Sequence, residues 1–397
     1  MSILKQQIEQ HCRIYHSEVV AMRRYIHANP ELGFQENNTA NFICKKLDEY
    51  GIPYKRNIAK TGIVGLIEGK RKDKVIALRA DMDALPIIET NEVAYKSKNE
   101  GVMHACGHDA HTSILLGAAK ILNEIKDQLD GIVKLIFQPS EEAFPGGAKM
   151  MIEEGVLKNP EVKNVIGEHV LPTLEAGKVG FRSGIYMAST DEIYLTIKGK
   201  GGHAATPDLN VDSVIIAAQI LVALQQVVSR NAQAWIPSVL SFGRVIADGH
   251  TNIIPDEVKI EGTFRTFDEK WRKEAHEKIK QIAQNTAKAM GGECDVRIAH
   301  GYPFLINDNL LTEKLKRYAA EYLGIKKVVD LDIRMTAEDF AYFTQALPSC
   351  FYRLGTKTKG KEVTNLHTSS FDIDENALYN GMGLMAYMTF RQLEEML

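Results

Sequence analysis

Two kinds of hydrophobic pattern alternate along most of the chain. Continuous apolar runs, which are typical of strands buried on both faces, occur in "KVIALRADMDALP", "GIVKLIFQPSEE", "NVIGEHVLP" and "PSCFYRLGT". Apolar residues at helical spacing occur from residue 17 to about 50, interrupted by the loop "HANPELGFQE", in "HTSILLGAAKILNEIKDQL", and in a closing segment from about Glu375. This alternation predicts an α/β fold in which a parallel or mixed sheet is sandwiched by helices.

The segment from about 184 to 299 follows a different order of elements. It predicts, in sequence, a strand in "DEIYLTIKGK", a helix in "VDSVIIAAQILVALQQVVSRN", strands in "PSVLSFGRVIA" and "DEVKIEGTFRTF", a helix in "EKWRKEAHEKIKQIAQNTAKAM" and a strand in "GECDVRIAH". This βαββαβ order is the ferredoxin-like arrangement. Since 397 residues exceed one ordinary core, we predict a small domain at 184–299 inserted into a larger domain formed by 1–183 and 300–397.

Composition narrows the class of protein. Hydrophobic residues make up 45% and charged residues 25% of the chain, as in folded globular proteins. A net charge of −3 provides no global field for nucleic acid or an anionic membrane, so we expect a small-molecule substrate and neither of those partners. The longest apolar run, "VDSVIIAAQILVAL", is interrupted by Gln219 and is shorter than the roughly 18 residues of a membrane span. The N-terminal segment does not resemble a signal peptide, so we expect a cytoplasmic protein.

The five cysteines are scattered and odd in number, unlike a secreted disulfide framework. One of them, Cys106, stands in "MHACGHDAH" two positions before His108. A thiolate and an imidazole are both ligands for zinc-like ions, and the intervening Gly107 lets both side chains turn toward one point. A Cys-x-His pair alone is a weak metal motif, because buried cysteines are common. We expect His104 and His111 to lie at the surface or to orient ligands rather than to bind metal.

Adjacent carboxylates follow the apolar strand in "IFQPSEE". Such a pair is usually a solvated loop, but Glu141 and Glu142 come at the carboxyl end of a strand, where α/β sheets hold their sites. Neighbouring residues of an extended chain point in different directions. Glu142 could therefore bind a metal while Glu141 acts as general base toward water, a division of roles that suits hydrolysis.

Two further histidines complete a candidate ligand set. His169 in "GEHV" and His367 in "NLHTSSF" are ordinary residues when considered alone. Together with Cys106, His108 and Glu142 they provide more ligands than one tetrahedral site needs. Two neighbouring ions that share a bridging ligand are therefore possible.

Two acidic pairs allow two interpretations each. Asp81 and Asp83 in "RADMDALP" follow a strand, where they could orient a ligating histidine or belong to a solvated turn. Glu338 and Asp339 in "TAEDFAYF" carry the same ambiguity.

The inserted segment contains the glycine-rich loop "IKGKGGHAATPD". It lacks the Walker pattern and the Rossmann glycine spacing, so we do not expect a nucleotide site. His203 in this loop could reach a substrate. Asn252 could bind a substrate carboxylate as a neutral donor and Arg265 as a bidentate guanidinium, although Arg265 could equally be a surface charge.

The motifs taken together resemble a known family over essentially the whole chain. The chain is similar to the metal-dependent amidohydrolases of the aminoacylase and carboxypeptidase-G-like group, and to its branch of hippurate hydrolases, indoleacetyl-amino-acid hydrolases and N-acetyl-diaminopimelate deacetylases. The motifs that carry the resemblance are "RRYIHANPELGFQE", "ALRADMDALP", "MHACGHDAH", "IFQPSEE", "GEHV", "GKGGHAATP", "TNIIPDEVKIEGTFR", "AEDF" and "LHTSSF".

This resemblance implies roles for the candidate residues. It implies a site for two divalent ions with Glu141 as the catalytic base, Asp83 supporting a ligand, and Cys106 in the bridging position that an aspartate fills in most relatives outside the branch. The implied ligands are Cys106, His108, Glu142, His169 and His367. The inserted domain would be a lid and dimerisation domain, in which His203 polarises the scissile carbonyl, in its own subunit or across a dimer interface, and Asn252 and Arg265 bind the substrate carboxylate.

The sequence departs from the branch at two places. Asp208 follows Pro207 where a histidine is usual, and Thr336 and Ala337 stand where a glycine-serine pair commonly precedes the Glu-Asp motif. These departures concern the substrate pocket rather than the metal ligands.

We therefore expect a homodimer or higher homo-oligomer that hydrolyses N-acyl-L-amino acids with two zinc, manganese, cobalt or nickel ions. The alternatives are a dipeptidase or carboxypeptidase that uses the same site and a non-catalytic metal-binding scaffold. A redox role for Cys106 is disfavoured, since no second cysteine lies near it in sequence.

Overall fold

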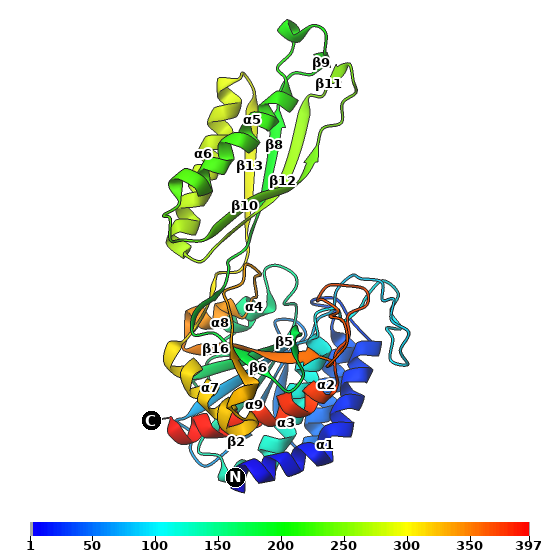
Figure 1. The fold of residues 1–397 in the computed structure, drawn as a ribbon, viewed down its shortest axis with the longest axis vertical. Coiled ribbons are helices and arrows are strands. Elements are labelled where there is room, and N and C mark those ends of the chain that lie inside the picture. The colour runs from blue at the N-terminus through cyan, green and yellow to red at the C-terminus, as the bar shows by residue number, and fades with distance from the viewer. Residues whose placement is uncertain (1–2, 397) are drawn as a thin grey trace. The chain divides into compact units, whose positions relative to one another are not determined.

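A computed structural model describes residues 3–396 and divides the chain into two compact units (Figure 1). Unit 1 comprises the chain up to Gly184 together with Ile306–Asp332 and the chain from Asp339 onward, and unit 2 comprises Ile185–Leu305 and Ile333–Glu338. The short segment Ile333–Glu338 joins unit 2, although the sequence pattern predicted that it belongs to the larger domain. Compactness assigns no role to either unit, so the division into a catalytic and a lid domain stays a prediction.

Unit 1 is built on an eight-stranded mixed sheet in the order β1-β2-β4-β3-β5-β16-β6-β15. Its strands are β1 (Tyr54–Ile58), β2 (Gly62–Glu68), β3 (Val75–Asp81), β4 (Ile132–Gln138), β5 (Asn164–Glu175), β6 (Val179–Phe181), β15 (Val328–Asp330) and β16 (Ser349–Lys357). The central strands β4, β3, β5 and β16 run parallel, while β1, β2 and β6 introduce antiparallel pairs. Every residue of β3 and β4 is buried, which confirms the predicted α/β fold with a mixed sheet.

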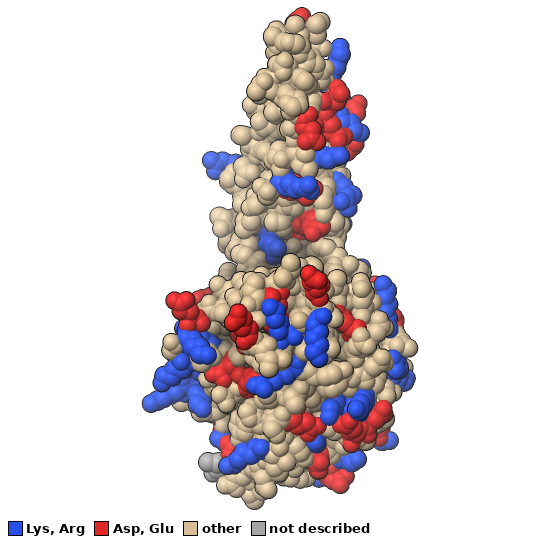
Figure 2. Space-filling model, turned by 90° about the vertical axis from the view of Figure 1, so that its right-hand side faces the viewer, with Lys and Arg blue, Asp and Glu red and all other residues tan. Residues whose placement is uncertain are grey.

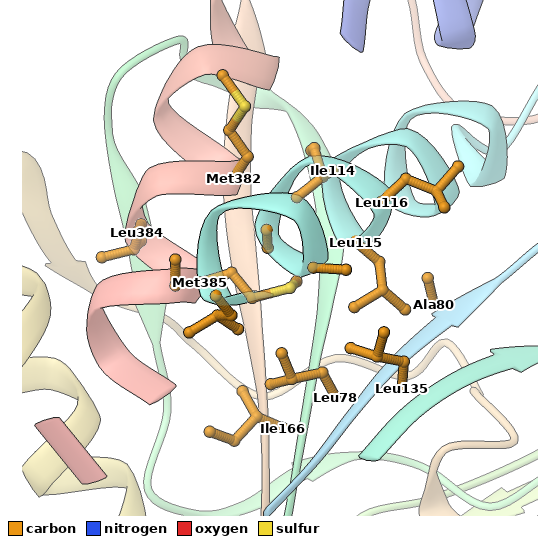
Figure 3. Packing of buried hydrophobic residues seen from close by; sticks show 14 of the residues in the cluster. Leu78, Ala80, Ile114, Leu115, Leu116, Leu135, Ile166, Met382, Leu384 and Met385 are labelled. Carbon is orange, nitrogen blue, oxygen red and sulfur yellow. The ribbon is translucent and has the colours of Figure 1, made fainter. Parts of the chain in front are cut away.

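Helices cover the sheet of unit 1. They are α1 (Ile3–Ala28), α2 (Asn37–Tyr50), α3 (His108–Glu124), α4 (Gly147–Glu153), α7 (Asn309–Leu323), α8 (Ala341–Ala346) and α9 (Asn376–Glu395). Helix α3 packs against α1, α9 and the central strands, and Leu78, Leu115, Ile166 and Met385 meet in this core (Figure 3). Gly117 permits the close packing, because a Cβ there would lie 2.9 Å from Val19 and 3.0 Å from Met382.

Two elements of unit 1 differ from those that the hydrophobic pattern predicts. Helix α1 begins at Ile3 rather than near residue 17, because its first turns bury a narrow stripe that includes Ile8 and Cys12 and leave most other positions polar. The edge hairpin formed by β1 and β2 was not predicted. Its first strand has no fully buried residue, so its sequence lacks a strong apolar pattern.

Unit 2 has the predicted ferredoxin-like fold. Its four-stranded antiparallel sheet has the order β10-β12-β8-β13. The elements are β8 (Asp191–Lys198), α5 (Ser213–Gln226), β10 (Ser238–Ile246), β12 (Glu257–Thr266), α6 (Glu269–Ala289) and β13 (Glu293–His300). A separate ribbon pairs β9 (Gly202–His203) with β11 (Ile253–Ile254). Helices α5 and α6 pack together over the sheet (Figure 1).

The apolar helix of unit 2 ends where the sequence predicted, at Asn231. Helix α5 continues through a π-turn (Val227–Asn231), so Ser213–Asn231 is long and apolar enough, by length and composition, to cross a membrane. Ile216, Ile220 and Leu224 are nevertheless packed in the core of unit 2, and a core helix of a folded domain meets the same criteria. The absence of a membrane partner stays a prediction.

Charge on the surface is mixed in sign. On the face that Figure 2 shows, lysines and arginines are interspersed with aspartates and glutamates. This face therefore offers no large single-sign field of the kind that nucleic-acid-binding proteins use.

Candidate metal centre

Cys106 and His108 enter the centre of unit 1 from the turn that precedes α3. Gly107 has φ +89°, and a Cβ there would lie 2.5 Å from Val170 Cγ2, so only glycine fits this turn. The turn brings Cys106 Sγ to 3.4 Å from Nε2 of His169 on β5. Strand β3 pairs with β5 only as far as Gly167. Because β3 continues two residues beyond this pair to Asp81, His169 lies level with the end of β3 and in the middle of β5, not at the carboxyl end of its own strand.

Glu142 and His367 approach the same point from two loops. Glu142 Oε1 lies 3.1 Å from His367 Nε2 and 4.0 Å from His108 Nε2. The ligand atoms of Cys106, His108 and His169 all lie within 4.8 Å of one another, as do those of Cys106, Glu142 and His367. The structure thus brings all five predicted ligands together, in two groups that share Cys106.

The ring hydrogen bonds fix which nitrogen of each buried histidine would face a metal when the ring is neutral. His108 Nδ1–H donates to the carbonyl oxygen of Asp83 at 2.9 Å, and His169 Nδ1–H donates to the carbonyl oxygen of Val170 at 2.8 Å. Because a carbonyl only accepts, the proton of each neutral ring is on Nδ1 and Nε2 is available as a ligand.

Two buried atoms of the cluster have no hydrogen-bond partner among the described residues. They are His108 Nε2 and Glu142 Oε1. A buried polar atom without a partner costs about 1–3 kcal/mol, and a cation between them would satisfy both. The donor set of one thiolate sulfur, imidazole nitrogens and a carboxylate suits zinc-like divalent ions. The residues present therefore fit a metal centre.

Electrostatics favour a cation at the same point. Burial disfavours the charged form of His108, but the carboxylates of Asp81 and Asp83 outweigh it and raise the pKa of His108 to about 10. Burial and the carboxylates of Glu142 and Glu141 raise the pKa of Cys106 well above its usual value. Without a metal, the protons held by His108 and Cys106 therefore offset the negative charge of the neighbouring carboxylates. A divalent ion would replace these protons, which couples its binding to pH.

The first acidic pair is buried, so the solvated-turn interpretation is wrong for it. Asp81 Oδ1 accepts a hydrogen bond from His111 Nδ1 at 2.6 Å. Asp83 Oδ1 lies 3.1 Å from His108 Nδ1, and its Oδ2 accepts from the backbone N–H of Glu142 at 3.0 Å. Asp83 is thus placed where it can orient two candidate ligands at once.

His104 and His111 are both buried rather than at the surface. His111 Nε2 accepts from the backbone N–H of Val170 at 2.9 Å. Neither ring nitrogen of His104 has a hydrogen-bond partner within residues 3–396.

Glu141 is buried beside the ligands. Its side chain is grouped with those of His108 and Glu142, with ligand atoms within 4.8 Å of one another. Its Oε1 accepts from the backbone N–H of Asp339 at 3.3 Å. Glu338 and Asp339 are also buried, so the solvated alternative is wrong for this second acidic pair too.

The three candidate residues of unit 2 do not form one group. His203 and Asn252 are exposed neighbours in the β9–β11 ribbon, where the N–H of Ala204 donates to the carbonyl oxygen of Asn252 at 3.1 Å. Arg265 lies at the opposite end of β12, past the pair of Phe264 with Asp191, and donates to Met335 O at 3.0 Å. Strand β12 begins at Glu257, just after the ribbon, and the eight residues of strand from there to Arg265 span about 27 Å. One carboxylate therefore cannot touch Asn252 and Arg265 of the same chain.

Comparisons with known proteins agree with this geometry. Residues 77–391 match Peptidase family M20/M25/M40. An N-acyl-L-amino acid amidohydrolase of Geobacillus stearothermophilus is 43% identical over 291 residues, 73% of this chain and 78% of the relative. IAA-amino acid hydrolase ILR1-like 4 of Arabidopsis thaliana is 39% identical over 95% of this chain and 86% of the relative. The solved YXEP protein of Bacillus subtilis, described as a dinuclear metal binding peptidase, has a TM-score of 0.82 at 35% identity, covering 96% of this chain and 99% of that one.

Proposed function

The chain belongs to peptidase family M20/M25/M40, and from this premise we propose that it hydrolyses the amide bond of N-acyl-L-amino acids, releasing a carboxylic acid and an amino acid. As a member of this family it is a metal-dependent amidohydrolase or peptidase. The observation that carries the proposal is the buried carboxylate of Glu141 next to a ligand cluster that keeps unpartnered atoms. A closed structural metal site needs no additional carboxylate base, so this arrangement favours catalysis over a scaffold role.

We further propose that the centre holds two divalent ions, of zinc, manganese, cobalt or nickel. The residues that would hold them are Cys106, His108, Glu142, His169 and His367, whose ligand atoms form two groups that share Cys106. Such a pair of ions would acidify a water molecule and polarise the substrate carbonyl. Glu141 would accept the proton of the attacking water and then deliver it to the leaving amine.

The separation of the unit 2 residues supports a homodimer as the working form. His203 and Asn252 of one protomer could meet a substrate whose carboxylate is bound by Arg265 of the other. Helix α5 exposes Val214, Ile215 and Val222, an apolar face suited to a second copy. Strand β10 is also at the edge of its sheet, where a further strand can pair.

Mixing two inactive variants tests the shared site. His203→Ala and Arg265→Ala should each be nearly inactive, and a mixed dimer should carry one site with both native residues. Random reassociation should then restore about a quarter of the native activity. No recovery despite demonstrated mixed dimers would show that His203 and Arg265 do not serve one site from two chains.

The hydrolytic proposal is tested by amine release from N-acetyl, N-benzoyl and indoleacetyl amino acids and from dipeptides with a free α-amino group. Glu141→Gln should retain its metal and lose roughly 10²–10⁴ of kcat, the usual contribution of a general base. Glu142→Gln is the matched control, because it should lose metal affinity as well. Near-normal turnover by Glu141→Gln would exclude Glu141 as the base, and cleavage of dipeptides alone would indicate a dipeptidase.

A further inference from the structure

Arg79 lies in the middle of the apolar strand β3 and is fully buried. Its guanidinium donates in three directions. Nε donates to Gln138 Oε1 at 2.8 Å, Nη1 to Asp81 Oδ2 at 2.7 Å, and Nη2 to Asp339 Oδ1 at 2.8 Å. A planar fork of this kind fixes the direction of each partner as well as its distance.

Asp339 is held from several sides by this network. Gln138 Nε2 donates to both of its carboxylate oxygens at 2.8 Å, and the backbone N–H of Ala148 donates to Oδ2 at 2.9 Å. The backbone N–H of Asp339 itself donates to Glu141 Oε1. The carboxylate of Asp339 is therefore anchored to β3 and β4, while its main chain contacts the proposed base.

We propose that Arg79, Gln138 and Asp339 are positioning residues that fix the carboxylate of Glu141, an inference that rests on the proposed function and extends it. Burying an arginine is costly, and a buried ion pair often stabilises a fold no more than apolar residues of the same volume. A general base, in contrast, gains from being held within hydrogen-bond reach of the proton it takes. An error of about 1 Å in such a group can lower the rate by about 10²-fold.

The same sheet provides a matched control. Lys134 on β4 is also buried, and its Nζ donates to the carbonyl oxygens of Val156, Lys158 and Pro160 at 2.8–3.0 Å. None of these groups contacts the metal centre. Lys134→Met should therefore destabilise the fold while leaving kcat within about twofold of the native value.

The experiment is a double-mutant cycle between Asp339→Asn and Glu141→Gln, measured on an N-acyl amino acid that the native enzyme hydrolyses. Asp339→Asn places an amide N–H₂ where Gln138 and Ala148 donate, so kcat should fall about 10–100-fold. KM and the affinity for added Zn²⁺ should stay within about twofold. In the Glu141→Gln background the same substitution should change kcat by less than about twofold, because the group it positions is already absent.

The inference would be overturned if Asp339→Asn lowered kcat by the same factor in the Glu141→Gln background as in the native enzyme. It would also be overturned if Asp339→Asn lowered the affinity for Zn²⁺ by the same factor as kcat. If Asp339→Asn does not fold, Gln138→Met, which removes two hydrogen bonds to Asp339, is measured in the same cycle. Failure of the native enzyme to cleave any N-acyl amino acid would instead contradict the proposed function, so the two failures are distinguishable.

Discussion

Each unit buries a cluster of charged residues, and the two clusters differ in how completely their atoms are paired. In unit 2, Asp191 Oδ1 accepts from Arg272 Nη2 at 2.6 Å and from the N–H of Gly301 at 3.2 Å. Its Oδ2 accepts from Arg272 Nε at 2.8 Å and from His276 Nε2 at 2.7 Å. In unit 1, by contrast, His108 Nε2 and Glu142 Oε1 make no hydrogen bond with any described residue, and the nearest contact of Glu142 Oε1 is His367 Nε2, itself a predicted ligand, at 3.1 Å.

The difference separates a structural cluster from a ligand-binding one. Asp191 begins β8, Arg272 and His276 belong to α6, and Gly301 follows β13, so the unit 2 cluster ties three elements of one fold together. A folded protein seldom leaves buried polar atoms unpaired without a reason. The unpaired atoms of the unit 1 cluster are those for which a bound cation would be the partner. Burial and charge alone do not distinguish a site, and His104 shows that a single unmatched side chain does not either; the unit 1 centre is distinguished by unmatched atoms within a group of converging ligand atoms.

The largest expected effect is on the unit 2 cluster. Asp191→Asn leaves the buried guanidinium of Arg272 without its carboxylate and should lower the free energy of unfolding by about 3–5 kcal/mol. Urea unfolding followed by circular dichroism measures this change. Zn²⁺ affinity should be unaltered, because the ligands belong to unit 1. A loss below about 1 kcal/mol would show that the paired cluster is not structural.

The pH dependence of stability gives a second readout of the same variant. Burial opposes ionisation of Asp191, but Arg272 and His276 lower its pKa to about 2. A lowered carboxyl pKa stabilises the fold above the unfolded value of 3.8, and this contribution is lost as pH falls toward 2. The native protein should lose about 2 kcal/mol over this range through Asp191, and Asp191→Asn should lack that component.

Metal removal should produce the next largest effect, and on the other cluster. An ion present at 100 times its Kd stabilises the folded state by about 2.7 kcal/mol. A chelator should therefore lower the unfolding midpoint of the native protein. Cys106→Ser should reduce the chelator effect, since serine is a poor ligand for such ions, whereas Asp191→Asn should leave it unchanged. Equal midpoints with and without metal would contradict a metal partner for the unpaired atoms.

The sequence predicted the parts of the molecule in which pattern and chemistry coincide. The apolar runs of β3 and β4 identified buried strands, and the polar residues that follow them, including Glu141 and Glu142, identified the side of the sheet that holds the centre. The turn at Gly107 was also predicted, because only glycine allows Cys106 and His108 to converge there.

Other features could not be predicted because they depend on contacts between distant segments. Arg79 is the one charged residue within an otherwise apolar run before Asp81, but its partner Asp339 lies 260 positions away. Likewise, Asn252 and Arg265 were assigned to one carboxylate by resemblance, and only the register of β12 shows that one chain holds them at opposite ends. A charged residue inside a buried strand is itself an indication of a buried partner.

The smallest expected effect comes from an exposed ion pair of similar length. Lys198 Nζ lies 2.7 Å from Asp295 Oδ2 on the sheet of unit 2, with side chains 51% and 71% exposed. Asp295→Asn should cost less than about 1 kcal/mol, because water solvates either charge after the partner is removed. The cost should disappear in about 1 M salt, where the screening length is about 3 Å. The Lys198–Asp295 distance equals that between His276 and Asp191, so the two pairs differ in burial and not in length. If Asp295→Asn lowered the free energy of unfolding as much as Asp191→Asn, distance rather than burial would set the stabilisation. A loss near zero would assign the difference between the two pairs to desolvation.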